Sequence, residues 1–266
     1  MRAEHQTACE LTEQLLTLAQ SAQDPAFLLQ AHYTLGVNLH HLGEFVSARE
    51  HFEQVLSLYD PQQHRSLAFL YGSFDPGVAC LSFAGLVLWL LGYPDQALRK
   101  SHAALALAQE LAQPFSLAVA LNWAAWLHQC RREGQAAQER AEAAMTLSTE
   151  QGFPVWLAMG TIKRGWALAE QGQGEEGIAQ LRQGLAASRA TGAEVARPHY
   201  LALLAEAYGR AGQAEEGLSA LAEALALVDK TGERHYEAEL YRLKGELLLN
   251  AERMANEGAR PKRNAE

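Results

Sequence analysis

Carboxylates and histidines are the residue types in this chain whose grouping could support catalysis or metal binding. Two carboxylate pairs, Glu175-Glu176 and Glu215-Glu216, each follow a glycine turn. Adjacent residues on a helix point about 100° apart, so neither pair can act as an acid and base on one substrate. Negative charge in the first turn of a helix is instead favoured by the helix dipole. We therefore assign both pairs to helix starts.

The histidines give no recognisable metal motif along the chain. His40-His41 are neighbours whose side chains diverge on a helix, and His128 stands two residues from Cys130. His-Glu-x-x-His and His-x3-His spacings are absent, and no Gly-x-Ser-x-Gly turn marks a nucleophile. The three cysteines form no Cys-x-x-Cys pair and are typical of buried apolar residues in a reducing compartment: Cys9, Cys80 and Cys130. The sequence thus predicts no metal, no cofactor and no enzymatic activity.

Composition and charge narrow the class of partner. The chain has 266 residues, a net charge of −9 and 48% hydrophobic residues, which is typical of an ordered protein. An acidic chain is poorly suited to nucleic acid, because phosphate binding requires a basic surface. The most apolar run, 81–91, is about half the length of a membrane helix. The N-terminus has no apolar signal-peptide core, so we expect a cytoplasmic protein with no membrane contact.

An internal repeat organises the sequence. The run Gly-Gln-Gly-Glu-Glu-Gly-Ile-Ala-Gln-Leu from Gly172 returns as Gly-Gln-Ala-Glu-Glu-Gly-Leu-Ser-Ala-Leu from Gly212, 40 residues later. A period of this size is typical of a solenoid of helix pairs. Turn glycines mark five such pairs: Gly43, Gly92, Gly134, Gly172 and Gly212. Prolines stand where the first helix of a pair should begin: Pro25, Pro76, Pro114, Pro154 and Pro198.

The expected elements are all helices, with no strand. First members of the pairs are expected at 25–42, 76–91, 114–132, 153–171, 194–211 and 234–254. Second members are expected at 44–59, 94–112, 135–150, 174–190 and 214–230. A lone helix at 3–22 has no partner before it, so the chain is expected to begin in mid-repeat. We expect one domain over 1–254, followed by a polar, disordered tail at 255–266 that carries Arg260 to Arg263.

An insertion at 59–77 lengthens one repeat. Its middle, 63–71, could form a short helix, and His64, Tyr71 and Asp75 make it a second candidate site. The favoured interpretation is structural: the segment closes a gap between repeats, and Asp75-Pro76 caps the next helix.

The helix pairs resemble the tetratricopeptide repeat. Small residues stand where that motif has them, as in Leu35-Gly36 with Ala48 and Ala84-Gly85 with Ala97. Arg164 and Lys244 stand where the motif prefers Leu. The resemblance implies an all-α, right-handed superhelical solenoid of about five hairpins plus flanking single helices.

The chain is also similar to the C-terminal repeat region of large bacterial signalling ATPases, many of them adenylate or guanylate cyclases. Three stretches carry this likeness: 88–98, 164–169 and 237–249. The family's cyclase and P-loop ATPase domains precede the repeats, and this chain contains neither a Gly-x4-Gly-Lys-[Ser/Thr] loop nor a Gly-rich strand-to-helix turn. Its catalytic activities are therefore not transferred.

In tetratricopeptide solenoids the first helix of each pair lines a concave groove. The resemblance places these residues there as the candidate partner-binding site: Tyr33, His40, Trp89, His128, Arg131, Arg132, Trp166, His199, Arg210 and Arg242. Arginines beside tryptophans are typical of binding hot spots, although Trp166 fits the core equally well and Trp89 fits the core better.

These observations favour a non-catalytic interaction module that docks a peptide or helix of a protein partner, including the ATPase or cyclase domains of its own protein. A small-molecule effector sensor is the first alternative, and an enzyme with an unrecognised site is the second. A ligand-induced rise in melting temperature would favour the sensor.

Overall fold

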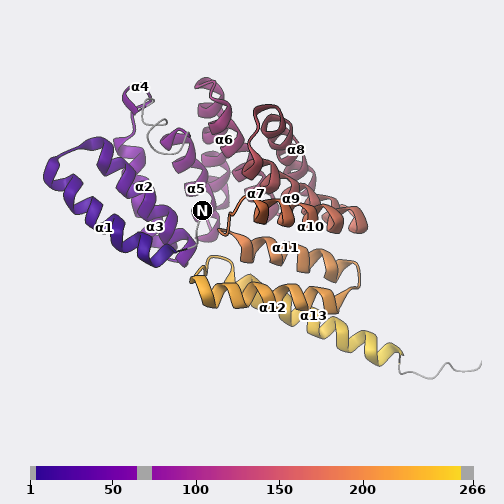
Figure 1. Cartoon of the computed structure of the whole chain (residues 1–266). Helices are drawn as coiled ribbons and strands as arrows, with labels where there is room; N and C mark the ends of the chain where they lie inside the picture. The colour runs from indigo at the N-terminus through magenta and orange to yellow at the C-terminus, as the bar shows by residue number, and fades with distance from the viewer. Residues whose placement is uncertain (1–3, 65–73, 259–266) are drawn as a thin grey trace, which may run out of the picture.

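A computed structural model describes residues 4–64 and 74–258, and within these residues every regular element is a helix (Figure 1). The helices are α1 (His5–Ala22), α2 (Pro25–Leu42), α3 (Phe45–Leu58), α4 (Pro61–His64), α5 (Pro76–Leu90), α6 (Pro94–Glu110), α7 (Pro114–Cys130), α8 (Gly134–Gln151), α9 (Pro154–Glu170), α10 (Gly174–Ala190), α11 (Arg197–Arg210), α12 (Ala214–Thr231) and α13 (Glu237–Gly258). The all-α prediction is confirmed.

The helices stack as hairpins in chain order. Five pairs pack as neighbours, α2 with α3, α5 with α6, α7 with α8, α9 with α10 and α11 with α12, while α1 and α13 flank them. First members also contact one another in sequence, from α2 through α5, α7, α9 and α11 to α13. They therefore form the inner layer of a right-handed superhelix, as predicted.

Prolines and aspartates start the inner helices as the sequence indicates. Four prolines are the first residues of α2, α5, α7 and α9. The Asp24 carboxylate accepts hydrogen bonds from the backbone N–H groups of Ala26 and Phe27. Asp75 likewise accepts from Val78, which confirms its role as the cap of α5. These caps satisfy backbone donors that the first helical turn leaves free.

The turn between α7 and α8 differs from the others. Gly43, Gly92, Gly172 and Gly212 have positive φ, as their turns require. At the third hairpin, Arg132 adopts φ 61°, whereas Gly134 already belongs to α8. A non-glycine residue in this conformation is uncommon, and its side chain belongs to the charged network described below.

Two inner helices begin later than predicted. Helix α11 starts at Arg197 instead of 194, and α13 starts at Glu237 instead of 234 and runs to Gly258. At α11 a side chain distant in sequence sets the start: Ala196 has φ 65°, and its N–H donates to the Glu233 carboxylate at 2.9 Å. A side chain from the α12–α13 linker thus binds the backbone that would otherwise extend α11.

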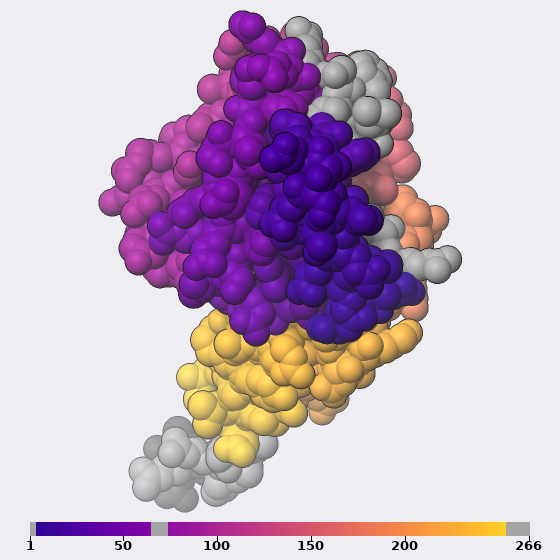
Figure 2. All heavy atoms as spheres, turned by 90° about the vertical axis from the view of Figure 1, so that its left-hand side faces the viewer, coloured from indigo at the N-terminus to yellow at the C-terminus, as the bar shows by residue number. Residues whose placement is uncertain are grey.

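The α12–α13 linker meets the end of α2. The backbone N–H groups of Arg234 and His235 both donate to the carbonyl of His41, at 2.7 and 3.2 Å. Leu42 Cδ2 lies 3.7 Å from the position of a Cβ on Gly232. In Figure 2 the indigo N-terminal helices rest directly on the orange and yellow C-terminal ones. The solenoid therefore closes into a ring, with the α12–α13 linker as its seam.

Several sequence predictions concern segments at the limits of the described residues. The insertion contains α4, and the remainder of the expected helix at 63–71, with Tyr71, lies outside the described residues. His64 is buried and Tyr59 donates from its hydroxyl to Asp75 at 2.8 Å. The basic stretch of the tail, 260–263, also lies outside the described residues.

Among the described residues, no helix has the length and hydropathy needed to cross a membrane.

The α9–α10 hairpin depends on glycine at its contact. A Cβ on Gly177 would lie 2.6 Å from the Gly165 carbonyl oxygen and 2.7 Å from the Ala169 nitrogen. We predict that Gly177→Ala lowers the free energy of unfolding by about 1–3 kcal/mol, because backbone atoms must move apart. Gly245→Ala is the control, because a Cβ there meets nothing within 4 Å. Helix propensity predicts that this change raises the free energy of unfolding by about 0.5–1 kcal/mol. Urea unfolding of both variants measures the difference, and equal effects would contradict the close contact.

Candidate functional site

The ten residues predicted to share one groove fall into three groups. Tyr33 lines an apolar cavity inside the ring. Four are buried in the inner layer and cannot reach a partner while the ring is closed: His40, His128, Trp166 and His199. Five lie together at one edge, around the ends of the inner helices: Trp89, Arg131, Arg132, Arg210 and Arg242. The expectation of a single exposed groove is therefore corrected.

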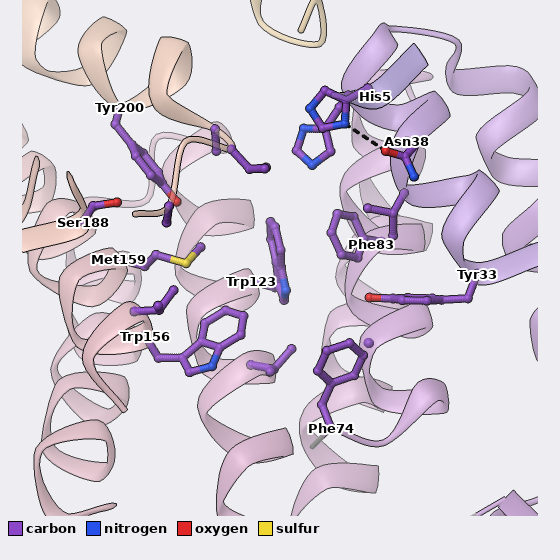
Figure 3. Close-up of a pocket in the computed structure, with 18 residues that line it drawn as sticks. His5, Tyr33, Asn38, Phe74, Phe83, Trp123, Trp156, Met159, Ser188 and Tyr200 are labelled. Atoms are coloured by element: carbon purple, nitrogen blue, oxygen red, sulfur yellow. Dashed lines mark hydrogen bonds between the residues drawn. The ribbon is translucent and has the colours of Figure 1, made fainter. Parts of the chain in front are cut away.

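The apolar cavity has a volume of about 350 Å³ and is bounded by α1, α2, α5, α7, α9, α10, the 193–196 linker and α11. Its aromatic walls include Phe83, Trp123 and Trp156, and Figure 3 shows Trp123 between the other two. A few polar groups lie among them: His5, Tyr33, Asn38, His41, Ser188 and Tyr200. An apolar cavity of this size with few polar groups is typical of a ligand pocket.

The arginines at the edge are already paired with glutamates of the same chain. Arg132 binds Glu206, which also accepts from the indole N–H of Trp166 at 3.0 Å. Arg210 lies 2.5 Å from Glu170 and 3.3 Å from Glu206. Arg242 pairs with Glu239 and Glu246 of its own helix. Because these glutamates neutralise the guanidinium groups, the edge is a mixed network and not a free positive surface for a partner's carboxylates.

Arg131 and His128 form a smaller group beside this network. Arg131 and the His128 Nδ1 both contact the Glu133 carboxylate, at 2.8 and 2.6 Å. The hydrogen bond from Arg131 is the main cause that lowers the pKa of Glu133. Arg131 also lies over the Trp89 ring at 5.9 Å, a cation–π distance. Trp89 is half-buried, so it contributes to the core and to this edge.

A buried cluster of histidines and one glutamate lies at the seam of the ring. Three imidazole nitrogens face the Glu233 carboxylate, from His235 at 3.4 Å, His41 at 3.6 Å and His5 at 3.8 Å. His40 stacks beside His235, with ring centroids 5.0 Å apart. Burial alone would raise the pKa of Glu233, but together the imidazoles of His41 and His5 lower it by more, so the net shift is downward. Burial lowers the pKa of His235 to about 3.

Lys163 of α9 is fully buried between aromatic rings. Its Nζ lies 5.4 Å from the ring centroids of both Trp126 and Tyr200 and has no hydrogen-bond partner within the described residues. Burial lowers its pKa to about 7. His199 stacks on Trp126 with centroids 4.3 Å apart and contacts Gln129 at 3.1 Å. Lys163 does not line the apolar cavity, so the lowered pKa of its amine reflects packing within the inner layer.

Comparison with known proteins identifies the fold. No protein-family profile and no curated protein matches the sequence. Among solved structures, a Rap protein complexed with competence and sporulation factor superposes with a TM-score of 0.58 and 11% identity, over 87% of this chain and 68% of that one. BtubC from P. vanneervenii superposes with a TM-score of 0.54 and 16% identity, over 99% of this chain and 94% of that one. A thermophilic TPR protein from Thermus thermophilus superposes with a TM-score of 0.51 and 24% identity, over 83% of this chain and 99% of that one.

The chain has a TPR-like solenoid fold. At these identities the comparisons establish the architecture of the repeats and nothing about the ligand. They also confirm the predicted resemblance to the tetratricopeptide repeat at the level of the fold.

Sequence reasoning missed the residues that matter most at the seam. His5, Glu233 and His235 belong to α1 and the α12–α13 linker, which are more than 200 residues apart along the chain. The reasoning that dismissed His40-His41 considered only their own helix, whereas the other groups come from the far end. One signal was present: His-Tyr follows a Thr-Gly turn twice, at 199–200 and at 235–236. Both copies place histidine in the buried interior.

The buried amine predicts a pH dependence of stability. The ordinary pKa of lysine is 10.5 and that of Lys163 is about 7, so between these values the unfolded chain holds one more proton. Raising the pH through this window therefore favours the folded state. Between pH 7 and 9, the free energy of unfolding of the wild type should rise, relative to that of Lys163→Met, by up to about 1.4 kcal/mol per pH unit.

Urea unfolding at pH 7, 8 and 9 measures this gain, and taking the difference between the two proteins cancels other titrations. Lys230→Met, which changes an exposed lysine, should track the wild type at every pH. A constant difference between wild type and Lys163→Met would show that the buried amine keeps its ordinary pKa.

Proposed function

We propose that this chain is a non-catalytic binding module that takes a peptide segment of a protein partner and seats an apolar side chain in the cavity inside the ring. The observation that carries the proposal is the aromatic-walled space of about 350 Å³ between the inner helices. Phe83, Trp123 and Trp156 supply large rigid apolar surfaces. The binding energy would come from burying an aromatic or long aliphatic side chain against them.

The polar groups around the cavity suit a peptide main chain. The hydroxyl groups of Tyr33 and Tyr200 and the Ser188 side chain point toward the space in Figure 3. The Asn38 side chain accepts from His5 Nδ1 at 2.9 Å and donates to the Thr34 carbonyl. Hydroxyl groups both donate and accept, so they can pair with amide N–H and C=O groups alike. The solved complex of a Rap protein with competence and sporulation factor supports binding by this fold.

The paired arginines change the mechanism expected from the sequence. Docking by arginine–carboxylate pairs would require breaking the Arg132–Glu206 and Arg210–Glu170 contacts. We therefore place the energetic centre of binding in the apolar cavity. The acidic chain and its resemblance at 88–98, 164–169 and 237–249 further support a role beside the catalytic domains of a signalling ATPase or cyclase in the cytoplasm.

A small-molecule effector is the second candidate, and the cavity volume favours it. About 350 Å³ lies within the usual range for small-molecule sites, roughly 300–1,000 Å³. Such a ligand would be mostly apolar with one or two hydrogen-bonding groups. It would be enclosed within the cavity, whereas a peptide would extend beyond it.

Filling the cavity tests both candidates. Val119 is buried and lines the space, so Val119→Trp should occupy it. Random peptides displayed on phage and selected on the wild-type chain should be enriched in aromatic and long aliphatic residues. Their affinity should fall at least about tenfold in Val119→Trp, since a lost apolar side chain contributes about 1.5–3 kcal/mol. The measurement is fluorescence anisotropy of the selected peptides, with equal helicity of the variants verified by circular dichroism.

Leu249→Trp is the matched control, because Leu249 is 69% exposed on α13 and away from the cavity. It should bind the peptides as the wild type does. Peptides that bind Val119→Trp and the wild type equally would contradict the proposed site. If no peptide is selected, but aromatic fragments raise the melting temperature of the wild type and not of Val119→Trp, the effector candidate replaces the peptide.

A further inference from the structure

The seam cluster brings together more nitrogen ligands than its own hydrogen bonds use. Buried imidazole nitrogens without a hydrogen-bond partner in the described part of the chain belong to all four histidines: His5 Nε2, His40 Nδ1 and Nε2, His41 Nδ1, and His235 Nδ1 and Nε2. Buried polar atoms are normally paired, and an unpaired one costs about 1–3 kcal/mol. Three of the six, His5 Nε2, His41 Nδ1 and His235 Nδ1, face the Glu233 carboxylate and point to a shared ligand there.

The tautomer of His5 shows what kind of ligand fits. The Oδ1 atom of Asn38 only accepts hydrogen bonds, so His5 Nδ1 must carry the proton in the 2.9 Å contact between them. In the neutral imidazole, Nε2 then presents a lone pair toward a Glu233 carboxylate oxygen 3.8 Å away. Two acceptors that face each other in a buried site repel, and a cation between them would relieve this repulsion. Asn38 orients the His5 ring in the way that hydrogen-bond partners orient metal-ligating histidines.

We propose that His5, His41, His235 and Glu233 bind a divalent transition-metal ion of the Zn²⁺ class at the seam of the ring. Two overlapping sets of donor atoms lie within 4.8 Å of one another: His5, His41 and Glu233, and His40, His41 and His235. Tetrahedral Zn²⁺ with bonds of about 2.0–2.1 Å to nitrogen requires donor atoms about 3.3 Å apart. The nitrogen-to-carboxylate distances of 3.4, 3.6 and 3.8 Å come close to this value.

The chemistry of the donors selects the ion. Imidazole with one carboxylate suits Zn²⁺ and other late first-row ions, whereas Mg²⁺ and Ca²⁺ prefer oxygen ligands alone. The Glu233 carboxylate is held by the Ala196 N–H, at 2.9 Å, which fixes its orientation. His40 is a further imidazole beside the site, adjacent to His235.

The ion would join the two ends of the solenoid. His5 comes from α1, His41 from α2, and Glu233 and His235 from the α12–α13 linker. The metal–ligand bonds would therefore close the ring. Two backbone hydrogen bonds to the His41 carbonyl join the same segments of the described chain. His5 and His41 also line the apolar cavity, so the ion would support one of its walls.

The test is direct metal binding by the chelator-treated full chain. Titration with Zn²⁺ against a chromophoric chelator should give one ion per chain with a dissociation constant in the micromolar range or tighter. His235→Gln and His5→Gln should each weaken binding by at least about 100-fold, since each removes a ligand. Asn38→Ala should weaken it by about 10–100-fold through loss of orientation. His102→Gln, which removes an exposed histidine from α6, should bind as the wild type does.

A second measurement needs no variant and so does not depend on their folding. X-ray absorption of the Zn²⁺-loaded wild type should show nitrogen and oxygen ligands at about 2.0–2.1 Å with the scattering of coordinated imidazole. Wild type that binds no Zn²⁺ at micromolar or tighter affinity would overturn the proposal. Binding that His5→Gln and His235→Gln leave unchanged, or absorption without imidazole ligands, would overturn it as well. None of these results depends on whether a peptide binds the cavity.

Discussion

Glu233 places a carboxylate shielded from solvent at the seam where the two ends of the solenoid meet. A buried charge is stable only when neighbouring groups replace the water it has lost. Here the backbone N–H of Ala196 donates to the carboxylate, and the imidazoles of His5, His41 and His235 surround it at 3.4 to 3.8 Å. They come from α1, α2, the linker before α11 and the linker after α12. One side chain therefore constrains four segments that are distant in sequence.

This constraint explains why the interior of the ring differs from an open groove. Aromatic side chains of the inner helices pack directly against one another, with ring centroids 4.4 Å apart for Phe83 and Trp123 and 4.9 Å for Trp123 and Trp126. Trp126 continues to His199 on α11. The layer joins the cavity to the seam, so the shape of the cavity depends on the closed ring. The charged network of Arg132, Glu170, Glu206 and Arg210 lies outside this layer and links the α7–α8 turn to α9 and α11 at the edge.

The fold could be predicted from local sequence signals because a solenoid is built from neighbouring repeats. Turn glycines, helix-starting prolines and small residues at contacts such as Gly165 and Gly177 each act within one or two hairpins. The predicted helix limits fail most clearly where a distant group intervenes, as when Glu233 binds Ala196. Even the exception at Arg132 involves tertiary contacts, with Glu206 two hairpins away.

The site was harder to predict because closure of the ring is not a local property. Tyr33, which the resemblance places on the concave side, lines the cavity. Arg132 and Arg210 lie together at the edge, but Glu206 and Glu170 pair with them there and neutralise their charge. Nothing in the spacing of His5 and His235 indicates that they meet, since that depends on the summed curvature of five hairpins.

Closure of the ring is the central claim, and a disulfide crosslink tests it most directly. A Cβ at Gly43 would lie 3.5 Å from the Cβ of Arg234, within the range of about 3.5–4.5 Å found in disulfides. The account predicts that Gly43→Cys/Arg234→Cys forms this crosslink rapidly within a monomer under mild oxidation, as mapped by mass spectrometry. Gly92→Cys/Arg234→Cys should not form it, because Gly92 has a similar backbone conformation, with φ 85° against 86° at Gly43, and no neighbour within 4 Å. If neither pair, or both equally, form the crosslink, the two ends do not meet in solution and the closed ring is wrong.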